Sequence, residues 1–138
     1  MIIDGKDLIV GRLATEVAKK AMLGEDVIVL NCEDVVISGR KRFVIDSNID
    51  RNRKGHHTQG PFIPKIPSLY VKRVIRGMLP YKQEKGRNAF QRIKCFNKVP
   101  AEFQGKEAET IKKADSSKLK DIKAVKIKEI CKVMGGKI

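Results

Sequence analysis

The sequence predicts a single α/β domain built around a mainly parallel sheet. Its 138 residues fit one domain, and the 41% of them that are hydrophobic are enough for a modest core. Near the N-terminus, a short apolar run, an amphipathic helix and an apolar, β-branched run follow one another along the chain. A strand, a helix and a buried strand in this order are typical of layered α/β folds with parallel strands.

The first forty residues supply these elements in order. Residues 2–3 fit an edge strand, and apolar side chains recur at helical period over residues 10–23, with Gly24 placed to end that helix. Residues 27–30 read Val-Ile-Val-Leu, which predicts a strand buried on both faces. Residues 35–37 (Val-Val-Ile) predict a second, shorter strand of the same kind.

The middle of the chain predicts two helices separated by a long loop. Ser38 is a candidate cap for a helix that continues to about Asn52. Residues 54–67 contain three prolines and two glycines, so we expect a loop there, and a loop of this length is usually functional or disordered. Ser68 is a candidate cap for the next helix, and Pro80 is expected to end it.

The remainder of the chain is less regular. A third basic helix is expected over residues 82–93, and residues 94–96 are a candidate strand. Residues 97–124 are polar, rich in lysine and poorly periodic, so they predict no regular element. Apolar residues at helical spacing over residues 127–134 predict a last short helix, which Gly135 is placed to end.

Positive charge is concentrated in the middle of the chain. Residues 40–98 carry sixteen Lys and Arg against three acids, a net charge of +13 out of +14, and they hold eight of the nine arginines. Residues 1–39 have a net charge of −3, and the lysine-rich extension 99–138 has +4. A cationic field this dense attracts a polyanion, usually nucleic acid, and guanidinium groups fork onto phosphate oxygens. We therefore expect one domain over residues 1–138 whose basic segment, residues 40–98, faces nucleic acid.

Motifs for catalysis and metal binding are absent from the sequence. It has no GxxxxGK[ST] phosphate loop, no GxGxxG and no HExxH, DxDxDG or GxSxG pattern. Cys32, Cys95 and Cys131 lack CxxC spacing, so we expect reduced thiols in the core. The adjacent pair His56–His57 has no further histidine to complete a metal site. The sequence therefore predicts neither a cofactor nor a metal, and no small-molecule substrate.

The sequence also gives an expectation about the compartment. No window of eighteen apolar residues exists, so no membrane-spanning helix is expected. The N-terminus, MIIDGKDLIV, has no basic region ahead of an apolar run and does not read as a secretory signal. The default expectation is the cytosol.

Aromatic residues are few in the basic segment. They are Phe43, Phe62, Tyr70, Tyr81 and Phe90. We expect the two tyrosines at the surface and Phe90 in the core. With so few exposed rings, recognition of RNA shape and backbone is expected rather than stacking on unpaired bases.

Two stretches of the sequence match the pattern of one family. The first contains GRLA at residues 11–14 and ISG at residues 37–39. The more specific one reads RVIRGMLP at residues 73–80 and continues with a KxxxGxxA pattern over residues 82–89. Over residues 1–100 the chain resembles the universal large-subunit ribosomal protein family numbered thirteen, and its C-terminal part is similar to the archaeal and eukaryotic branch.

The resemblance implies a three-layer α/β/α domain around a small, mostly parallel, four-stranded sheet. It also implies a structural, non-catalytic constituent of the large ribosomal subunit, which binds large-subunit rRNA in translation, contacts neighbouring ribosomal proteins and resides on the cytoplasmic ribosome. Gly60 and Gly77 would allow close approach of the backbone to RNA, or tight turns. The motif residues that it marks as rRNA contacts are Arg40, Lys41, Arg73, Arg76, Lys82 and Arg92.

The candidate RNA-binding residues combine these motif residues with other side chains of the basic segment. They are Arg40, Lys41, Arg42, Arg51, Arg53, Lys54, His56, Lys65, Lys72, Arg73, Arg76, Lys82, Lys85 and Arg92. Two other functions fit a basic α/β domain: an RNA-modifying or RNA-cleaving enzyme, and a free RNA chaperone or translational regulator. An enzyme needs a convergent catalytic set, which we do not find. A solvated face without a partner would normally mix positive and negative charges.

Overall fold

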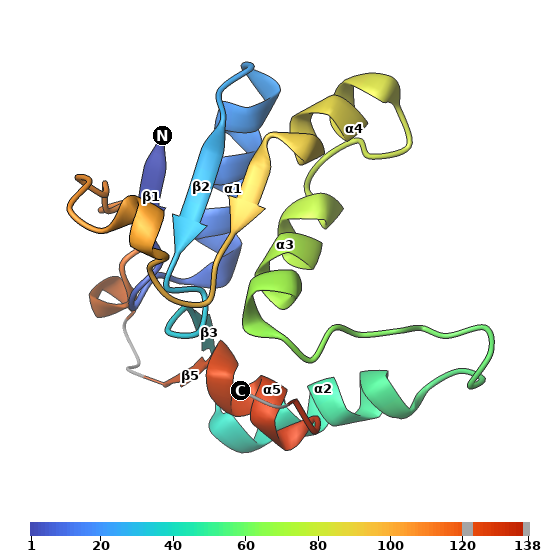
Figure 1. Cartoon of the computed structure of the whole chain (residues 1–138). Helices are drawn as coiled ribbons and strands as arrows, with labels where there is room; N and C mark the ends of the chain where they lie inside the picture. Colours follow the sequence, from blue (N-terminus) through green and yellow to red (C-terminus); the bar gives the residue numbers. More distant parts are fainter. Residues whose placement is uncertain (120–122, 137–138) are drawn as a thin grey trace.

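The computed structural model describes residues 1–119 and 123–136 as a mixed α/β structure (Figure 1). Residues 120–122 and 137–138 of the predicted C-terminal extension lie outside the described residues. In chain order the described elements are β1 (Ile2–Asp4), α1 (Val10–Met22), β2 (Val27–Leu30), β3 (Val36–Ser38), α2 (Lys41–Arg53), α3 (Pro67–Gly77), α4 (Glu84–Gln91), β4 (Ile93–Cys95), the 3-10 turns η1 (Ala101–Phe103) and η2 (Ser116–Lys118), β5 (Ala124–Lys126) and α5 (Ile127–Val133).

Three strands form a parallel sheet in the order β1-β2-β4. Ile3 of β1 pairs with Val29 of β2, and Ile93 of β4 pairs with Val27 on the other side. All four side chains are fully buried, as expected for short apolar strands in a layered fold. The predicted edge strand, buried strand and parallel sheet are confirmed, and the candidate strand after the third basic helix is present as β4.

β3 and β5 form a separate antiparallel ladder, in which Ile37 lies opposite Val125. An isolated bridge between Ile9 and Val36 connects this ladder to the start of α1. The strand predicted at residues 35–37 therefore exists, but outside the parallel sheet. The four-stranded sheet that the family resemblance implies is not confirmed, because β3 finds its partner in the C-terminal part of the chain.

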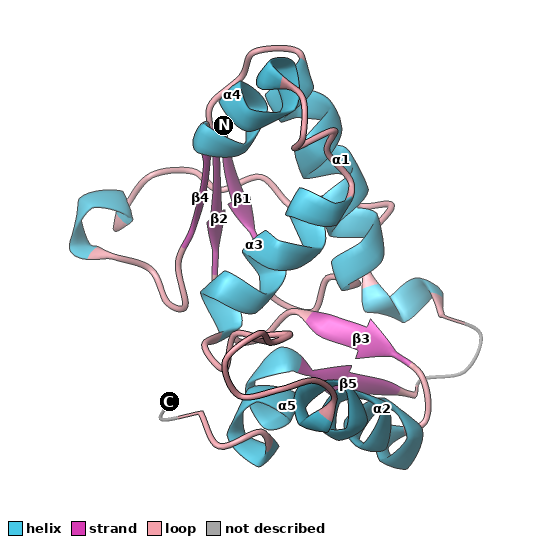
Figure 2. Ribbon diagram, turned by 90° about the vertical axis from the view of Figure 1, so that its right-hand side faces the viewer, coloured by secondary structure: helices cyan, strands magenta, loops and turns pink. Residues whose placement is uncertain are grey.

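The helices α1, α3 and α4 lie together on one side of the parallel sheet (Figure 2). Leu13 and Val17 of α1, Val71 and Ile75 of α3, and Ala89 of α4 are fully buried and form the core with the strands. The turn η1 lies on the other side of the sheet, and α2 and α5 lie against the β3–β5 ladder (Figure 2). The described residues do not confirm a three-layer arrangement.

The two N-terminal helix caps that the sequence predicts, at Ser38 and Ser68, are both wrong. Ser38 is the last residue of β3, and α2 begins after Arg40, whose backbone is extended. α3 begins at Pro67, because a proline in the first turn lacks only an N–H that has no partner within the helix. Ser68 follows inside that turn, and its N–H donates to Oδ1 of Asn97 (2.8 Å). The partner that satisfies this helix start comes from a distant loop, which the local sequence does not reveal.

The helix ends follow the sequence more closely. α1 ends at Met22, and Gly24 adopts a left-handed backbone (φ 101°), as predicted. α3 ends at Gly77, ahead of Pro80. α5 ends at Val133, and Gly135 follows with a φ of 87°. The third basic helix is shorter than predicted, since α4 covers Glu84–Gln91.

Ion pairs connect the C-terminal elements to the acidic N-terminal part of the chain. Nζ of Lys126 lies 2.7 Å from Oδ1 of Asp34, and this hydrogen bond raises the pKa of Lys126. Nζ of Lys128 lies 3.3 Å from Oε2 of Glu33, which is buried. These contacts neutralise part of the charge of the extension within the protein. In the basic segment, by contrast, only Lys41 and Arg42 of the candidate residues pair with carboxylates in the part of the chain that is described.

Candidate nucleic-acid interface

The helices and the loop of the basic segment follow the outer edge of the molecule. Figure 1 shows α4, α3 and the loop 54–66 one after another on the right and α2 along the bottom, with β1 on the left. None of the fourteen candidate residues is buried, and Lys72, Arg73 and Arg92 are half-buried. They lie as follows: Arg40, Lys41, Arg42, Arg51 and Arg53 at or in α2; Lys54, His56 and Lys65 in the loop; Lys72, Arg73 and Arg76 in α3; Lys82, Lys85 and Arg92 in or beside α4.

Few of these cations are neutralised within the described residues. Lys41 pairs with Glu129 of α5 (2.6 Å), and Arg42 pairs loosely with Asp46 of its own helix (3.8 Å). Such exposed pairs are weak and are easily exchanged for a phosphate partner. The other candidates have no carboxylate within salt-bridge distance in the part of the chain that is described.

Two of the arginines also hold the fold together. Nη1 of Arg92 donates to the carbonyl oxygen of Ala21 near the end of α1 (3.4 Å), so this guanidinium caps a neighbouring helix. Nη1 of Arg73 donates to the carbonyl oxygen of Phe62, which ties the loop to α3. Arg87, which the sequence analysis left out, is exposed on α4, and its place in the basic segment was the available signal.

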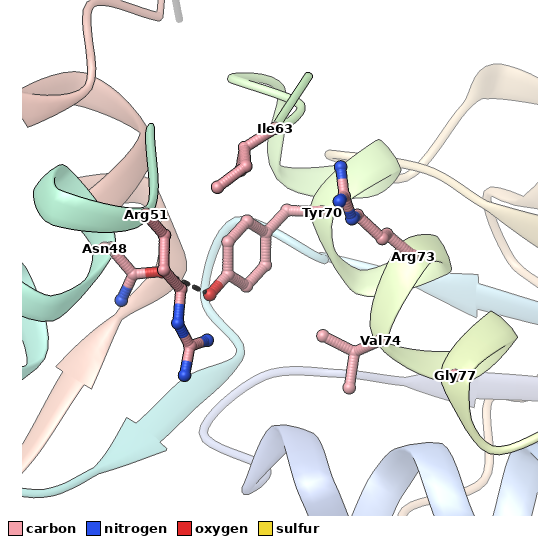
Figure 3. A pocket seen from close by; sticks show the side chains of 7 residues that line it. All are labelled: Asn48, Arg51, Ile63, Tyr70, Arg73, Val74 and Gly77. Atoms are coloured by element: carbon pink, nitrogen blue, oxygen red, sulfur yellow. Dashed lines mark hydrogen bonds between the residues drawn. The ribbon is translucent and has the colours of Figure 1, made fainter. Parts of the chain in front are cut away.

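A hollow of about 260 Å³ lies between α2 and α3 (Figure 3). Ile63 and Val74 line it, and Arg51 of α2 and Arg73 of α3 contribute guanidinium groups. Tyr70 lies between the two helices. This hollow therefore combines apolar walls with two cations from separate helices.

Tyr70 is not the surface ring that the sequence predicts. Its residue is 9% exposed, and its hydroxyl donates to Oδ1 of Asn48 in α2 (2.8 Å; Figure 3). Nδ2 of Asn48 in turn donates to the carbonyl oxygen of Val44 (2.7 Å). A buried polar pair of this kind fixes α2 against α3, which sets the spacing of their arginines. Phe90, expected in the core, is half-buried, and Tyr81 is exposed as predicted.

We expect Tyr70→Phe to lower the free energy of unfolding by about 1–2 kcal/mol at neutral pH, because Oδ1 of Asn48 would lose its donor inside the protein. Burial raises the pKa of Tyr70 above its usual value of 10. The unfolded chain therefore loses this proton first, and the stability of the native protein should fall as the pH rises past about 10. Urea unfolding at pH 7 and pH 11 measures both effects. A variant with the same pH dependence as the native chain would contradict this role.

The three cysteines are free thiols. Cys32 and Cys131 are buried and Cys95 is half-buried, which confirms their predicted place in or near the core. The structure also brings Cys32 and Cys95 together, although they are far apart in the sequence. The pKa of Cys32 is raised, mainly by a hydrogen bond with Cys95 and to a smaller extent by burial. Burial alone raises the pKa of Cys131 to about 11. Cys95 is the last residue of β4, and Cys32 lies two residues beyond the end of β2, where its N–H donates to the carbonyl oxygen of Phe96 (3.0 Å).

Neither a metal site nor a membrane-spanning helix is found among the described residues. Within residues 1–119 and 123–136, no three His, Cys, Asp or Glu side chains gather as metal ligands would. Among the helices described, none combines the length and the apolar character that crossing a bilayer requires.

These features define a class of protein. It is a small, basic α/β protein whose candidate site consists of cations on three helices and a loop, most of them without a carboxylate partner in the described residues. Comparison with known proteins agrees with this description. The family model described as ribosomal protein L13 matches residues 1–102.

Several curated relatives cover nearly the whole chain, and each is named large ribosomal subunit protein uL13. The relative from Methanosarcina barkeri is 39% identical over 137 residues, which is 99% of this chain and 98% of its own. The relative from Archaeoglobus fulgidus is 38% identical over 135 residues, 97% of this chain and 86% of its own. The relative from Methanocaldococcus jannaschii is 36% identical over 140 residues, 99% of this chain and 98% of its own.

The chain belongs to the ribosomal protein L13 family. The resemblance found in the sequence is therefore confirmed, including its archaeal branch. Membership in a family of ribosomal proteins also confirms the prediction that the chain is not an enzyme.

Proposed function

We propose that this chain is a structural constituent of the large ribosomal subunit and binds large-subunit rRNA through its basic segment. In this role it acts in translation, on the ribosome in the cytoplasm, beside neighbouring ribosomal proteins and without a cofactor. Family membership supports the first part of the proposal. The single observation that supports the second is that none of the candidate cations is buried and that most of them lack a carboxylate partner in the described residues.

The physical basis of binding is charge neutralisation between rRNA helices. Phosphates that approach one another repel, and cations placed between them remove this repulsion while condensed counterions are released. The rigid core holds α2, α3 and α4 in fixed positions, so their cations would meet the RNA backbone in one geometry. The N-terminal and C-terminal parts chiefly provide this support, since several of their charges are paired with each other.

The affinity of the purified protein for large-subunit rRNA should fall steeply with salt. Five or six neutralised phosphates would give a slope of about −4 to −5 in a plot of log K against log salt concentration. The double variant Lys82→Ala/Lys85→Ala should make this slope shallower by about 1.5 to 2, because both exposed lysines belong to the basic segment. Filter binding at a series of salt concentrations measures the slope.

The matched control is Lys112→Ala/Lys113→Ala, which removes the same charge from two exposed lysines of the C-terminal extension. Its slope should equal that of the native protein. Equal losses in the two double variants would show that net charge alone decides binding. Equal affinity for small-subunit rRNA would also argue against the proposed target.

A further inference from the structure

A second groove in the basic segment combines exposed aromatic surface with cations. It has a volume of about 240 Å³ and lies where the loop 54–66 meets α3 and α4. Its apolar walls include Phe62, Leu69 and Phe90, and its cations are Lys72, Arg73 and Arg76. Among the described residues, no carboxylate lines it. This composition differs from that of a solvated charged face, which has no reason to expose rings.

The apolar residues of this groove are unusually open to solvent. Phe62 is 68% exposed and Leu69 is 50% exposed. Phe90 forms part of the same wall, and Nζ of Lys72 lies 4.9 Å from the centroid of its ring. Exposure of a phenyl ring to water is unfavourable, so covering the ring with a flat apolar partner lowers the free energy.

The backbone holds Phe62 in position before any partner arrives. Its carbonyl oxygen accepts a hydrogen bond from Arg73, and its neighbours include Pro61 and Pro64, whose rings restrict the backbone. Little conformational freedom of the loop would therefore be lost when a partner binds to the ring. The loop presents Phe62 beside α3 rather than packing it into the core.

The chemistry of the groove fits one kind of partner. A nucleotide base has a flat apolar face, which stacks on aromatic rings irrespective of its identity. The phosphates on either side of that base carry the negative charge that Lys72, Arg73 and Arg76 would neutralise. An apolar side chain of a neighbouring protein would cover the rings but leave these three cations without partners.

We propose that this groove binds an unpaired base of large-subunit rRNA, stacked on Phe62, with its flanking phosphates on the cations of α3. The inference rests on the proposed function, and it names the part of the RNA that this region recognises. It also departs from the sequence analysis, which predicted recognition of shape and backbone rather than stacking. An exposed ring can stack on a base only where that base is unpaired, because the bases of a double-stranded RNA helix are already stacked on one another.

The test measures binding of Phe62→Ala to large-subunit rRNA. We expect the affinity to fall about 5- to 150-fold, which is the range for loss of one stacked base. The slope against salt should not change, because no charge is removed. Phe62→Trp should retain the native affinity, and Phe62→Leu should bind between the two. Ultraviolet cross-linking of the native complex, read by mass spectrometry, should join a nucleotide to the peptide that contains Phe62.

Leu23→Ala is the control, since Leu23 is a 73% exposed apolar residue at the end of α1, outside the basic segment and outside this groove. It should bind rRNA like the native protein. The groove proposal is overturned if Phe62→Ala binds as tightly as the native chain while Lys82→Ala/Lys85→Ala binds more weakly, and the proposed function then still stands. It is also overturned if Phe62→Leu binds rRNA with full affinity and the native complex gives no cross-link at Phe62, because apolar contact without stacking on a base would then be sufficient. If the native protein does not bind large-subunit rRNA in a salt-dependent manner, the proposed function itself is rejected.

Discussion

Gly86→Ala should destabilise the protein more than any other single substitution considered for this chain. Gly86 is buried in the first turn of α4, and a Cβ atom there would lie 2.1 Å from the carbonyl oxygen of Pro80 and 2.4 Å from its carbon. Both are backbone atoms of the turn that connects α3 to α4, so neither can move aside as a flexible side chain would. We expect a loss of about 3 kcal/mol, the upper part of the range for overpacking. Thermal unfolding should show a fall in Tm of about 10 °C.

Gly11→Ala provides the control within the same protein. Gly11 lies in α1, and a Cβ atom added there meets nothing within 4 Å. Alanine is the better helix former, so this variant should gain about 0.5–1 kcal/mol. Opposite signs for the two substitutions would locate the effect in the contact with Pro80. If Gly86→Ala unfolds like the native protein, α4 can shift away from this turn, and the position of Lys82 and Lys85 is less fixed than the structure indicates.

Elements with strong local patterns could be predicted from the sequence, because their signals need no distant partner. The apolar stripe of α1, the β-branched run of β2 and the glycine after α1 each act through neighbouring residues. The pairing of β3 with β5 joins residues far apart in the chain, and short strands carry no mark of their partner. The start of α3 was predicted wrongly for the same reason, because the residue that accepts the hydrogen bond from the N–H of Ser68 is Asn97, in a remote loop.

The candidate site shows the same division. The concentration of positive charge could be predicted, because it follows from the distribution of Lys and Arg along the chain. The internal roles of single residues could not. Lys41 forms an ion pair with Glu129, Arg92 donates a hydrogen bond to Ala21 near the end of α1, and Tyr70 donates one to Asn48. Each of these contacts depends on tertiary packing. The exposure of Phe62 could not be predicted either, because no local pattern distinguishes an exposed ring from a packed one.

Arg73→Ala and Arg76→Ala should each weaken binding to large-subunit rRNA about 5- to 150-fold, or roughly 1–3 kcal/mol. Arg76 is exposed on α3, with its guanidinium carbon 5.1 Å from the centroid of the Tyr81 ring, so it is oriented without being neutralised. Arg76→Lys should recover part of the loss, because lysine keeps the charge but cannot fork onto a phosphate. Equilibrium binding at one moderate salt concentration measures all three variants.

Arg73→Ala should have the larger effect of the two, because it also removes the hydrogen bond that ties Phe62 to α3. Arg12→Ala is its control: Arg12 likewise donates to a backbone carbonyl, that of Lys113 (3.3 Å), but lies outside the basic segment. That variant should bind rRNA normally. If both α3 variants keep native affinity and a native unfolding curve, α3 is not part of the contact surface, and the rRNA would have to be held by α2 and α4 alone. The arrangement of Figure 1 argues against that outcome, because α3 lies between these two helices.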